Sequence, residues 1–277
     1  MKIIISPVDF SEESKNALSF AIELSQRSSA RLIAIHVMQN NEEEEETKIK
    51  LKSIESGLEK FDCPNILFEI LLVKGDFIIE LKKVIEKFNP DIIVMGTKGA
   101  SGLKKLLIGS NTVKVISKTK VPVLVIPDLA RFKNFMNKKN NRIVFATDLK
   151  IMENDQPLEI LKTIAMLTVD PKLSVLNVRP KHTVLYDLTK MERETLLSYF
   201  KPEVESERIT IYNRNVIDGI NLYLDKKTDI CLIAMISHDS GDLIQKHYSR
   251  EMALHTHLPL LVLHEVKLSS NVLFKNN

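Results

Sequence analysis

Short apolar runs alternate along the chain with segments of helical periodicity. In the first half, strand-like apolar runs occur at residues 2–8, 31–38, 66–73, 92–95 and 121–126. The segments between them place apolar side chains every three to four positions, as Ala17, Phe20, Ala21 and Leu24 do. Ser11 is the expected N-cap of the first helix. Apolar strands that alternate with helices predict a parallel sheet covered on both faces.

The same order of elements repeats in the second half of the chain. Four segments match at offsets of 137 to 141 residues, which pairs 3–9 with 142–148, 32–37 with 173–178, 91–96 with 229–234, and 120–126 with 257–263. Four matches in the same order indicate an internal duplication. This alignment places Ala234 opposite Gly96 and Ser237 opposite Gly99.

The duplication predicts two domains. A chain of 277 residues has room for two domains of about 100 to 150 residues each. The segment between them lacks a strand pattern and is rich in lysine and asparagine, as a linker would be. The expected limits are a first domain at 1–127, a linker at 128–141, a second domain at 142–265 and a C-terminal tail at 266–277.

Charge and composition narrow the classes of partner. The 39 basic and 36 acidic residues give a formal net charge of +3, which argues against a nucleic-acid-binding face or a polybasic membrane anchor. No apolar run approaches the roughly 20 residues of a membrane-spanning helix, and the first residues do not form a secretory signal. We therefore expect a cytoplasmic protein without a membrane partner. Cys63 and Cys231 have no second thiol at a metal-binding or redox spacing and are expected to be inert.

Glycine is concentrated in one loop. Half of the eight glycines in the chain follow the apolar run 92–95, at Gly96, Gly99, Gly102 and Gly109. Ser110 then precedes a helical pattern, so backbone N–H groups and the positive end of the helix dipole can face an anion there. Lys98, Lys104 and Lys105 add positive charge. The alternative interpretation is that the glycines only shape the loop.

The spacing of these glycines resembles a family signature. Gly96, two residues, Gly99, nine residues and Gly109-Ser110 match the G-x2-G-x9-G-[ST] pattern of ATP-binding universal stress proteins, and the segments 94–99 and 121–126 are similar to that family too. The resemblance extends over 1–127 and 142–265. It implies two tandem doubly wound α/β domains, Rossmann-like and similar to adenine-nucleotide α-hydrolases, each with five parallel strands in the order 3-2-1-4-5.

The resemblance also implies a ligand, ATP with or without magnesium, and the residues that bind it. In ATP-binding members the adenine lies against the end of the second strand, here Val37, and an aspartate after the first strand, here Asp9, lies near the nucleoside and its metal. The glycine loop lies under the ribose and phosphates, and the start of the next helix holds the phosphate tail. The implied binding residues are Asp9, Val37, Gly96, Gly99, Gly109, Ser110 and Asn111. For Asp9, an Asx-turn or a charge at a helix start is the alternative.

The second half departs from this pattern. Counting back from Pro259 places Lys246 and His247 where the first half has Gly109 and Ser110, so the phosphate cradle is missing. Asp148 and Val178 survive at the strand ends. Five of the seven histidines fall between residues 238 and 264, but their spacing is not typical of zinc ligands. We assign no metal-ligand set and no catalytic residue in either half.

Three functions fit the sequence. The first is a stress-response or signalling protein that binds an adenine nucleotide in its first domain and uses the second domain as a structural or regulatory partner. The second is a ligand-free module for protein interaction or dimerisation. The third is a slow ATPase. The last strands, 121–126 and 258–263, are apolar edges that we expect to pair within the chain or in a homodimer.

Overall fold

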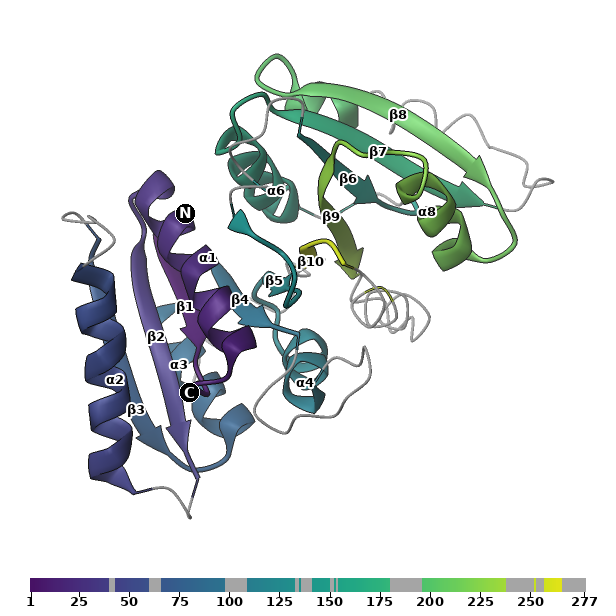
Figure 1. The fold of residues 1–277 in the computed structure, drawn as a ribbon. Helices are drawn as coiled ribbons and strands as arrows, with labels where there is room; N and C mark the ends of the chain where they lie inside the picture. The colour runs from purple at the N-terminus through teal and green to yellow at the C-terminus, as the bar shows by residue number, and fades with distance from the viewer. Residues whose placement is uncertain are drawn as a thin grey trace, which may run out of the picture. The chain divides into compact units, whose positions relative to one another are not determined.

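The computed structural model describes residues 1–39, 43–59, 66–97, 109–132, 135, 141–149, 152, 154–179, 196–237, 252 and 257–265. The chain divides into two compact units, Met1–Phe132 and Lys133–Asn277. Each unit contains a parallel sheet with helices packed on it (Figure 1).

The first unit alternates strands and helices as the apolar pattern predicts. Its elements are β1 (Ile3–Pro7), α1 (Glu12–Ser28), β2 (Arg31–Met38), α2 (Glu44–Glu59), β3 (Phe68–Lys74), α3 (Phe77–Phe88), β4 (Ile92–Gly96), α4 (Ser110–Lys118) and β5 (Val123–Ile126). The strands are parallel and lie in the order β3-β2-β1-β4-β5. This order confirms the doubly wound fold.

The second unit repeats the arrangement. Its elements are β6 (Arg142–Ala146), α6 (Gln156–Met166), β7 (Lys172–Arg179), β8 (Glu205–Tyr212), α8 (Val216–Leu224), β9 (Ile230–Ser237) and β10 (Leu260–His264). Its parallel strands lie in the order β8-β7-β6-β9-β10, which is the order of the first unit. The structure therefore confirms two tandem domains of one fold.

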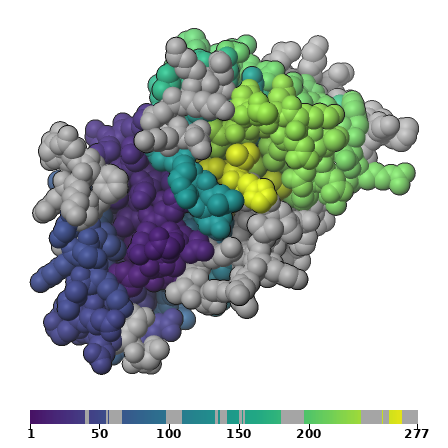
Figure 2. Space-filling model, in the orientation of Figure 1, coloured from purple at the N-terminus to yellow at the C-terminus, as the bar shows by residue number. Residues whose placement is uncertain are grey.

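Helix α1 shows why the local sequence gives this structure. The Ser11 side chain accepts a hydrogen bond from the backbone N–H of Ser14 at 3.1 Å, so Ser11 is the N-cap, as predicted. Ser29 ends the helix in the left-handed conformation, with φ of 53°. The apolar face predicted for this helix, Ala17, Phe20, Ala21 and Leu24, is buried. It lies against the sheet of the first unit, and the helix forms a patch of purple on the molecular surface (Figures 1 and 2).

The strand register corrects one part of the sequence alignment. Ile93 donates its backbone N–H to Pro122, and Ile233 donates in the same way to Pro259, so these two residues are equivalent. Counting forward, Gly96 corresponds to Ile236, and not to Ala234 as the alignment predicted. Ser237 accordingly corresponds to Thr97 rather than to Gly99. An irregularity in the pairing of β6 with β9 between Arg142 and Ile143 accounts for one residue of this two-residue difference.

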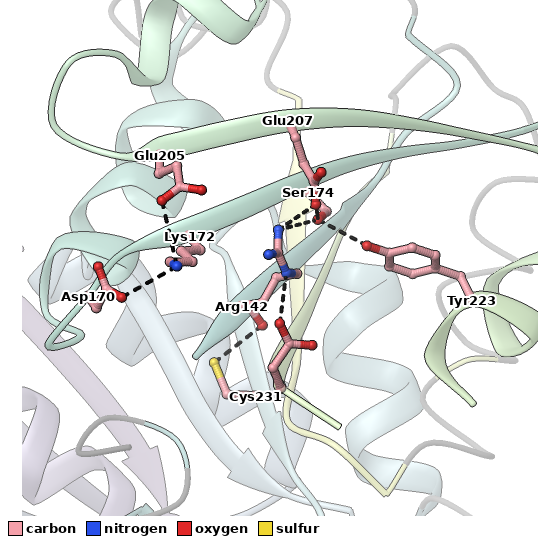
Figure 3. Close-up of polar contacts among 9 residues, drawn as sticks. Arg142, Asp170, Lys172, Ser174, Glu205, Glu207, Tyr223 and Cys231 are labelled. Atoms are coloured by element: carbon pink, nitrogen blue, oxygen red, sulfur yellow. Dashed lines mark hydrogen bonds and ion pairs between the residues drawn. The ribbon is translucent and has the colours of Figure 1, made fainter. Parts of the chain in front are cut away.

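Arg142 ties together three strands of the second unit. Its guanidinium forms ion pairs with Glu207 at 2.5 Å and with Asp229 at 3.1 Å, and it donates a hydrogen bond to Ser174 (Figure 3). The Tyr223 hydroxyl also donates to Ser174 at 3.1 Å. Burial disfavours the charged guanidinium, but the hydrogen bond to Asp229 and the two carboxylate charges outweigh burial and raise the pKa of Arg142.

Replacement of Arg142 with methionine is expected to lower the free energy of unfolding by about 1.5 kcal/mol. The Arg142 side chain is 15% exposed, but Glu207 and Asp229 are 47% and 32% exposed, so water compensates much of the lost pairing. The matched control is Lys172→Met, because Lys172 reaches Asp170 and Glu205 only at 3.6 Å (Figure 3). Urea unfolding that shows equal losses for both variants would contradict a special role for Arg142.

The buried thiol of Cys231 predicts an alkaline loss of stability. Burial raises the pKa of Cys231 from 9.0 to about 12, so the folded state keeps the neutral thiol while the unfolded chain ionises. This contribution to stability is complete below about pH 9 and is lost as the pH rises towards 12. The free energy of unfolding is expected to fall by about 2 kcal/mol between about pH 9 and about pH 10.5. A Cys231→Val variant should show a smaller fall in urea titrations, and an equal fall would refute the assignment.

Within the described residues, none of the helices combines the length and the apolar character needed to cross a lipid bilayer.

Candidate functional site

A cavity of about 590 Å³ opens at the carboxyl ends of β1, β2 and β4 in the first unit. The strand order reverses between β1 and β4, and open α/β sheets bind ligands at such a switch point. The cavity wall consists of residues from the strand ends, the start of α1, the segment from Gln39 into α2, the start of α3 and the start of α4. The cavity wall is therefore formed by short segments that lie far apart in the sequence.

Six of the seven predicted binding residues line this cavity. They are Asp9, Val37, Gly96, Gly109, Ser110 and Asn111. The seventh, Gly99, lies outside the described residues, as do Gly102 and the loop lysines Lys98, Lys104 and Lys105. The structure thus brings together the ends of two strands, a loop residue shortly after a third strand and the start of a helix, as the resemblance implied.

Asp9 stabilises the loop between β1 and α1. Its Oδ1 accepts hydrogen bonds from the backbone N–H of Ser11 at 3.1 Å and from the Ser11 hydroxyl at 2.5 Å, which is an Asx-turn. The Asp9 N–H in turn donates to the Ser14 hydroxyl at 3.3 Å. Phe10 between them has a left-handed backbone, with φ of 64°. The conformational alternative considered for Asp9 is therefore present, and any contact with a nucleoside would be a second role of this carboxylate.

An aromatic wall, absent from the predicted set, borders the same cavity. His36 is buried in β2, and its Nδ1 lies 2.7 Å from the carbonyl oxygen of Val8. The Phe10 ring lies 4.5 Å from the His36 ring, centre to centre, and the Lys50 ammonium lies 5.8 Å from the Phe10 ring centre. These contacts join residues 26 to 40 positions apart, so the sequence offered only one signal, a histidine inside an apolar strand. Flat rings of this kind can contact a planar base.

The start of α4 presents backbone donors to the cavity. Gly109 is the N-cap, and among the described residues no side chain caps this helix. Ser110 is thus the first residue of the helix and not its cap. Thr112 donates its hydroxyl to the Gly96 carbonyl at 2.9 Å, which fixes the helix against the end of β4. The N–H groups of the first turn and the dipole of α4 can therefore face an anion.

Gly96 is required first for the packing of α1. A Cβ atom at this position would lie 2.8 Å from the carbonyl oxygen of Glu13 and 2.9 Å from its carbonyl carbon. Real Cβ atoms do not approach backbone atoms this closely, so any larger residue would displace the first turn of α1. The resemblance places this glycine under the ribose and phosphates, and the structure shows that helix α1 also approaches it closely.

The described cavity wall is acidic on one side. Glu43 and Glu46 come from the segment that follows β2, whereas the start of α4 lies beside β4. A hydrogen bond from Lys50 and its positive charge lower the pKa of Glu46, so this carboxylate stays ionised. Among the described residues, no three His, Cys, Asp or Glu side chains gather as a metal site. Of the described parts of the wall, the α4 side is therefore the one that favours an anion.

The equivalent place in the second unit holds a much smaller cavity, of about 80 Å³. Asp148 and Val178 line it, but Ile236 stands at the position of Gly96. Helix α6 begins at Gln156, five residues later than an offset of 139 residues from the start of α1 would place it. An isoleucine at the position of Gly96 would clash with a helix turn that was placed as the first turn of α1 is. The side-chain volume and the late helix start together explain why the second cavity is small.

Comparisons with known proteins agree with this architecture. The family model for universal stress proteins matches residues 1–127. A universal stress protein from Methanocaldococcus jannaschii is 30% identical over 152 residues, which cover 45% of this chain and 94% of that protein. A second universal stress protein from the same organism is 28% identical over 141 residues, covering 45% of this chain and 81% of that relative. The crystal structure of a universal stress protein from Archaeoglobus fulgidus has a TM-score of 0.72 at 22% identity, covers 95% of this chain and 98% of that chain, and so shares the fold of both units. The chain belongs to the universal stress protein family.

Proposed function

We propose that the first unit binds an adenine nucleotide, ATP in the first place, and that the protein uses this binding in stress response or signalling. One observation carries the proposal: six residues from separate parts of the sequence line one cavity of about 590 Å³. Pockets for small molecules commonly measure about 300 to 1000 Å³. The second unit, whose equivalent cavity is small, would serve as a structural or regulatory partner.

The charges of the wall support one orientation of the nucleotide. The base would lie on the side of Val37, against the rings of Phe10 and His36. The phosphates would lie at the start of α4, where Ser110 and Asn111 supply backbone and side-chain donors. Carboxylates such as Glu43 repel a triphosphate from the opposite side. The same carboxylates can accept hydrogen bonds from amino or hydroxyl groups.

Magnesium fits this proposal as a companion of the nucleotide. Mg²⁺ prefers oxygen ligands and commonly keeps several waters, so it needs only one or two carboxylates in addition to the phosphates. Asp9 is the residue of this chain that would hold it. The ion would neutralise phosphate charge when bound. The hydrogen bonds from Ser11 to Asp9 already fix the carboxylate at the end of β1.

Native mass spectrometry of freshly purified full-length protein and calorimetric titration with ATP test the proposal. The expected result is one nucleotide per chain. ADP, AMP, cyclic AMP, adenosine and GTP in the same titration define which part of the ligand is recognised. Absence of binding for every adenine compound would refute the proposal, and two equivalent sites per chain would refute the assignment to the first unit alone.

Two observations favour a second candidate, a ligand-free interaction module. The Asx-turn of Asp9 and the contact of Gly96 with Glu13 explain two motif residues by folding alone. The titration distinguishes the candidates, because the module predicts no nucleotide binding. If ATP binds, we expect hydrolysis slower than about 1 per second, the low end of usual enzyme turnover. Faster release of phosphate would favour an ATPase.

A further inference from the structure

One face of the β7–β8 pair in the second unit carries two arginines and, in its described part, no acid. Residues that share this face recur at every second position. On β8 they are Ser206, Arg208, Thr210 and Tyr212, and on β7 they are Leu173, Val175, Asn177 and Arg179. The strand register places Arg179 beside Tyr212 and Arg208 beside Val175. The carboxylates of Glu205 and Glu207 belong to the opposite face.

Both guanidiniums contact uncharged side chains of the same face. Arg179 donates from Nη2 to the Tyr212 hydroxyl at 3.0 Å, and its guanidinium carbon lies 5.1 Å from the centre of the Tyr212 ring. Arg208 donates from Nη2 to the Thr210 hydroxyl at 3.2 Å. Thr210 and Tyr212 are successive members of this face, so the two positive groups converge on one stretch of β8.

Three N–H groups of this arginine pair are buried without an acceptor. Within the described part of the chain, Nε and Nη1 of Arg179 and Nε of Arg208 have no hydrogen-bond partner and almost no contact with solvent. An unpaired buried donor on a charged group costs free energy, because it has lost its hydrogen bonds to water without forming others in the protein. A guanidinium has five donors in a planar fork, which matches the oxygens of a phosphate or carboxylate.

The first unit has apolar residues at both arginine positions, and its Lys74 stands at the position of Tyr212. By the strand register, Met38 corresponds to Arg179, and Ile70 corresponds to Arg208. Methionine and isoleucine at these positions complete an ordinary parallel-sheet face. The duplicated fold therefore does not need arginine there, and the two charges are specific to the second unit.

We propose that Arg179 and Arg208, with Tyr212 and Thr210, form an anion site in the second unit that binds a phosphate group. Two guanidiniums suit the double negative charge of a phosphate monoester or of free phosphate better than the single charge of a carboxylate. The three unpaired N–H groups supply donors, and the two hydroxyls can rotate to donate as well. This site is distinct from the nucleotide cavity and would give the second unit a ligand of its own.

Thermal unfolding of the full-length protein in inorganic phosphate, against chloride at equal ionic strength, tests the site. About 20 mM phosphate is expected to raise the unfolding midpoint by about 3 °C. Glycerol 2-phosphate in a parallel series distinguishes a phosphorylated metabolite from free phosphate, since the natural class should act at the lower concentration. Either order supports the site, and failure of both anions to raise the midpoint overturns it.

The decisive variant is Arg179→Met combined with Arg208→Ile, which installs the residues of the first unit. It should be as stable as the wild type or more stable in chloride, and phosphate should no longer raise its midpoint. The matched control is Arg214→Met, which removes the same charge from an exposed turn of the same unit and should retain the phosphate effect. An equal effect of phosphate on the double variant would refute the site. ATP should still bind the double variant with one equivalent. Failure of the anion site would therefore show in the phosphate series, and failure of the proposed nucleotide site would show in the ATP titration.

Discussion

Replacement of Gly96 with isoleucine is expected to abolish nucleotide binding in the first unit and to lower the free energy of unfolding by about 3 kcal/mol. The added Cβ would meet the backbone of Glu13 at 2.8 Å, and backbone atoms cannot move aside as the end of a side chain can. The first turn of α1 must shift, and with it the loop in which Asp9, Ser11 and Ser14 are hydrogen-bonded. Isoleucine is also the residue that occupies the equivalent position, Ile236, in the second unit.

Urea unfolding and calorimetric titration measure the two effects separately. Gly96→Ala should give a weaker form of both, because it adds the Cβ alone. The matched control is Ile236→Val in the second unit, which should cost about 1 kcal/mol and leave ATP affinity unchanged. A folded Gly96→Ile protein that binds ATP with unchanged affinity would contradict the link between α1 packing and the cavity.

Much of the fold could be predicted from the sequence because its signals are local. Each β-strand is a nearly continuous apolar run, and Ser11 begins α1 at the position that its capping side chain indicates. The duplication then transferred the same prediction to the second unit. The alignment nevertheless failed at β9, because a register irregularity beside Arg142 leaves no trace in the apolar pattern. Only the hydrogen bonds of Ile93 and Ile233 reveal the true correspondence.

The candidate site was predicted in part for the same reason. The glycine spacing and the strand-end residues Asp9 and Val37 are sequence signals, and they line the cavity. Phe10 and His36 meet across 26 residues of sequence, and the left-handed backbone of Phe10 depends on the Asx-turn around it. The arginine pair of the second unit could not be predicted either, because its residues come from two strands. Only the strand register shows that the two arginines correspond to Met38 and Ile70 of the first unit.

Replacement of Ser110 with aspartate is expected to weaken ATP binding about 100-fold while leaving adenosine binding nearly unchanged. Ser110 is the first residue of α4, where the phosphates of the proposed nucleotide would lie, so a carboxylate there would occupy the donors and repel the phosphates. The same carboxylate interacts favourably with the helix dipole, so the free energy of unfolding should be unchanged or rise by about 0.5 kcal/mol. Binding and stability are therefore expected to change in opposite directions.

The matched control is Asn215→Asp, which adds the same charge at the N-cap of α8 in the second unit. Aspartate and asparagine are comparable N-caps, so this variant should fold normally and bind ATP as the wild type does. Titrations with ATP, AMP and adenosine give the loss of affinity per phosphate group. If Ser110→Asp weakened ATP and adenosine equally, the cavity would have been distorted. If it weakened neither, the phosphates would not lie at the start of α4, and the orientation deduced from Glu43, Glu46 and the helix dipole would be wrong.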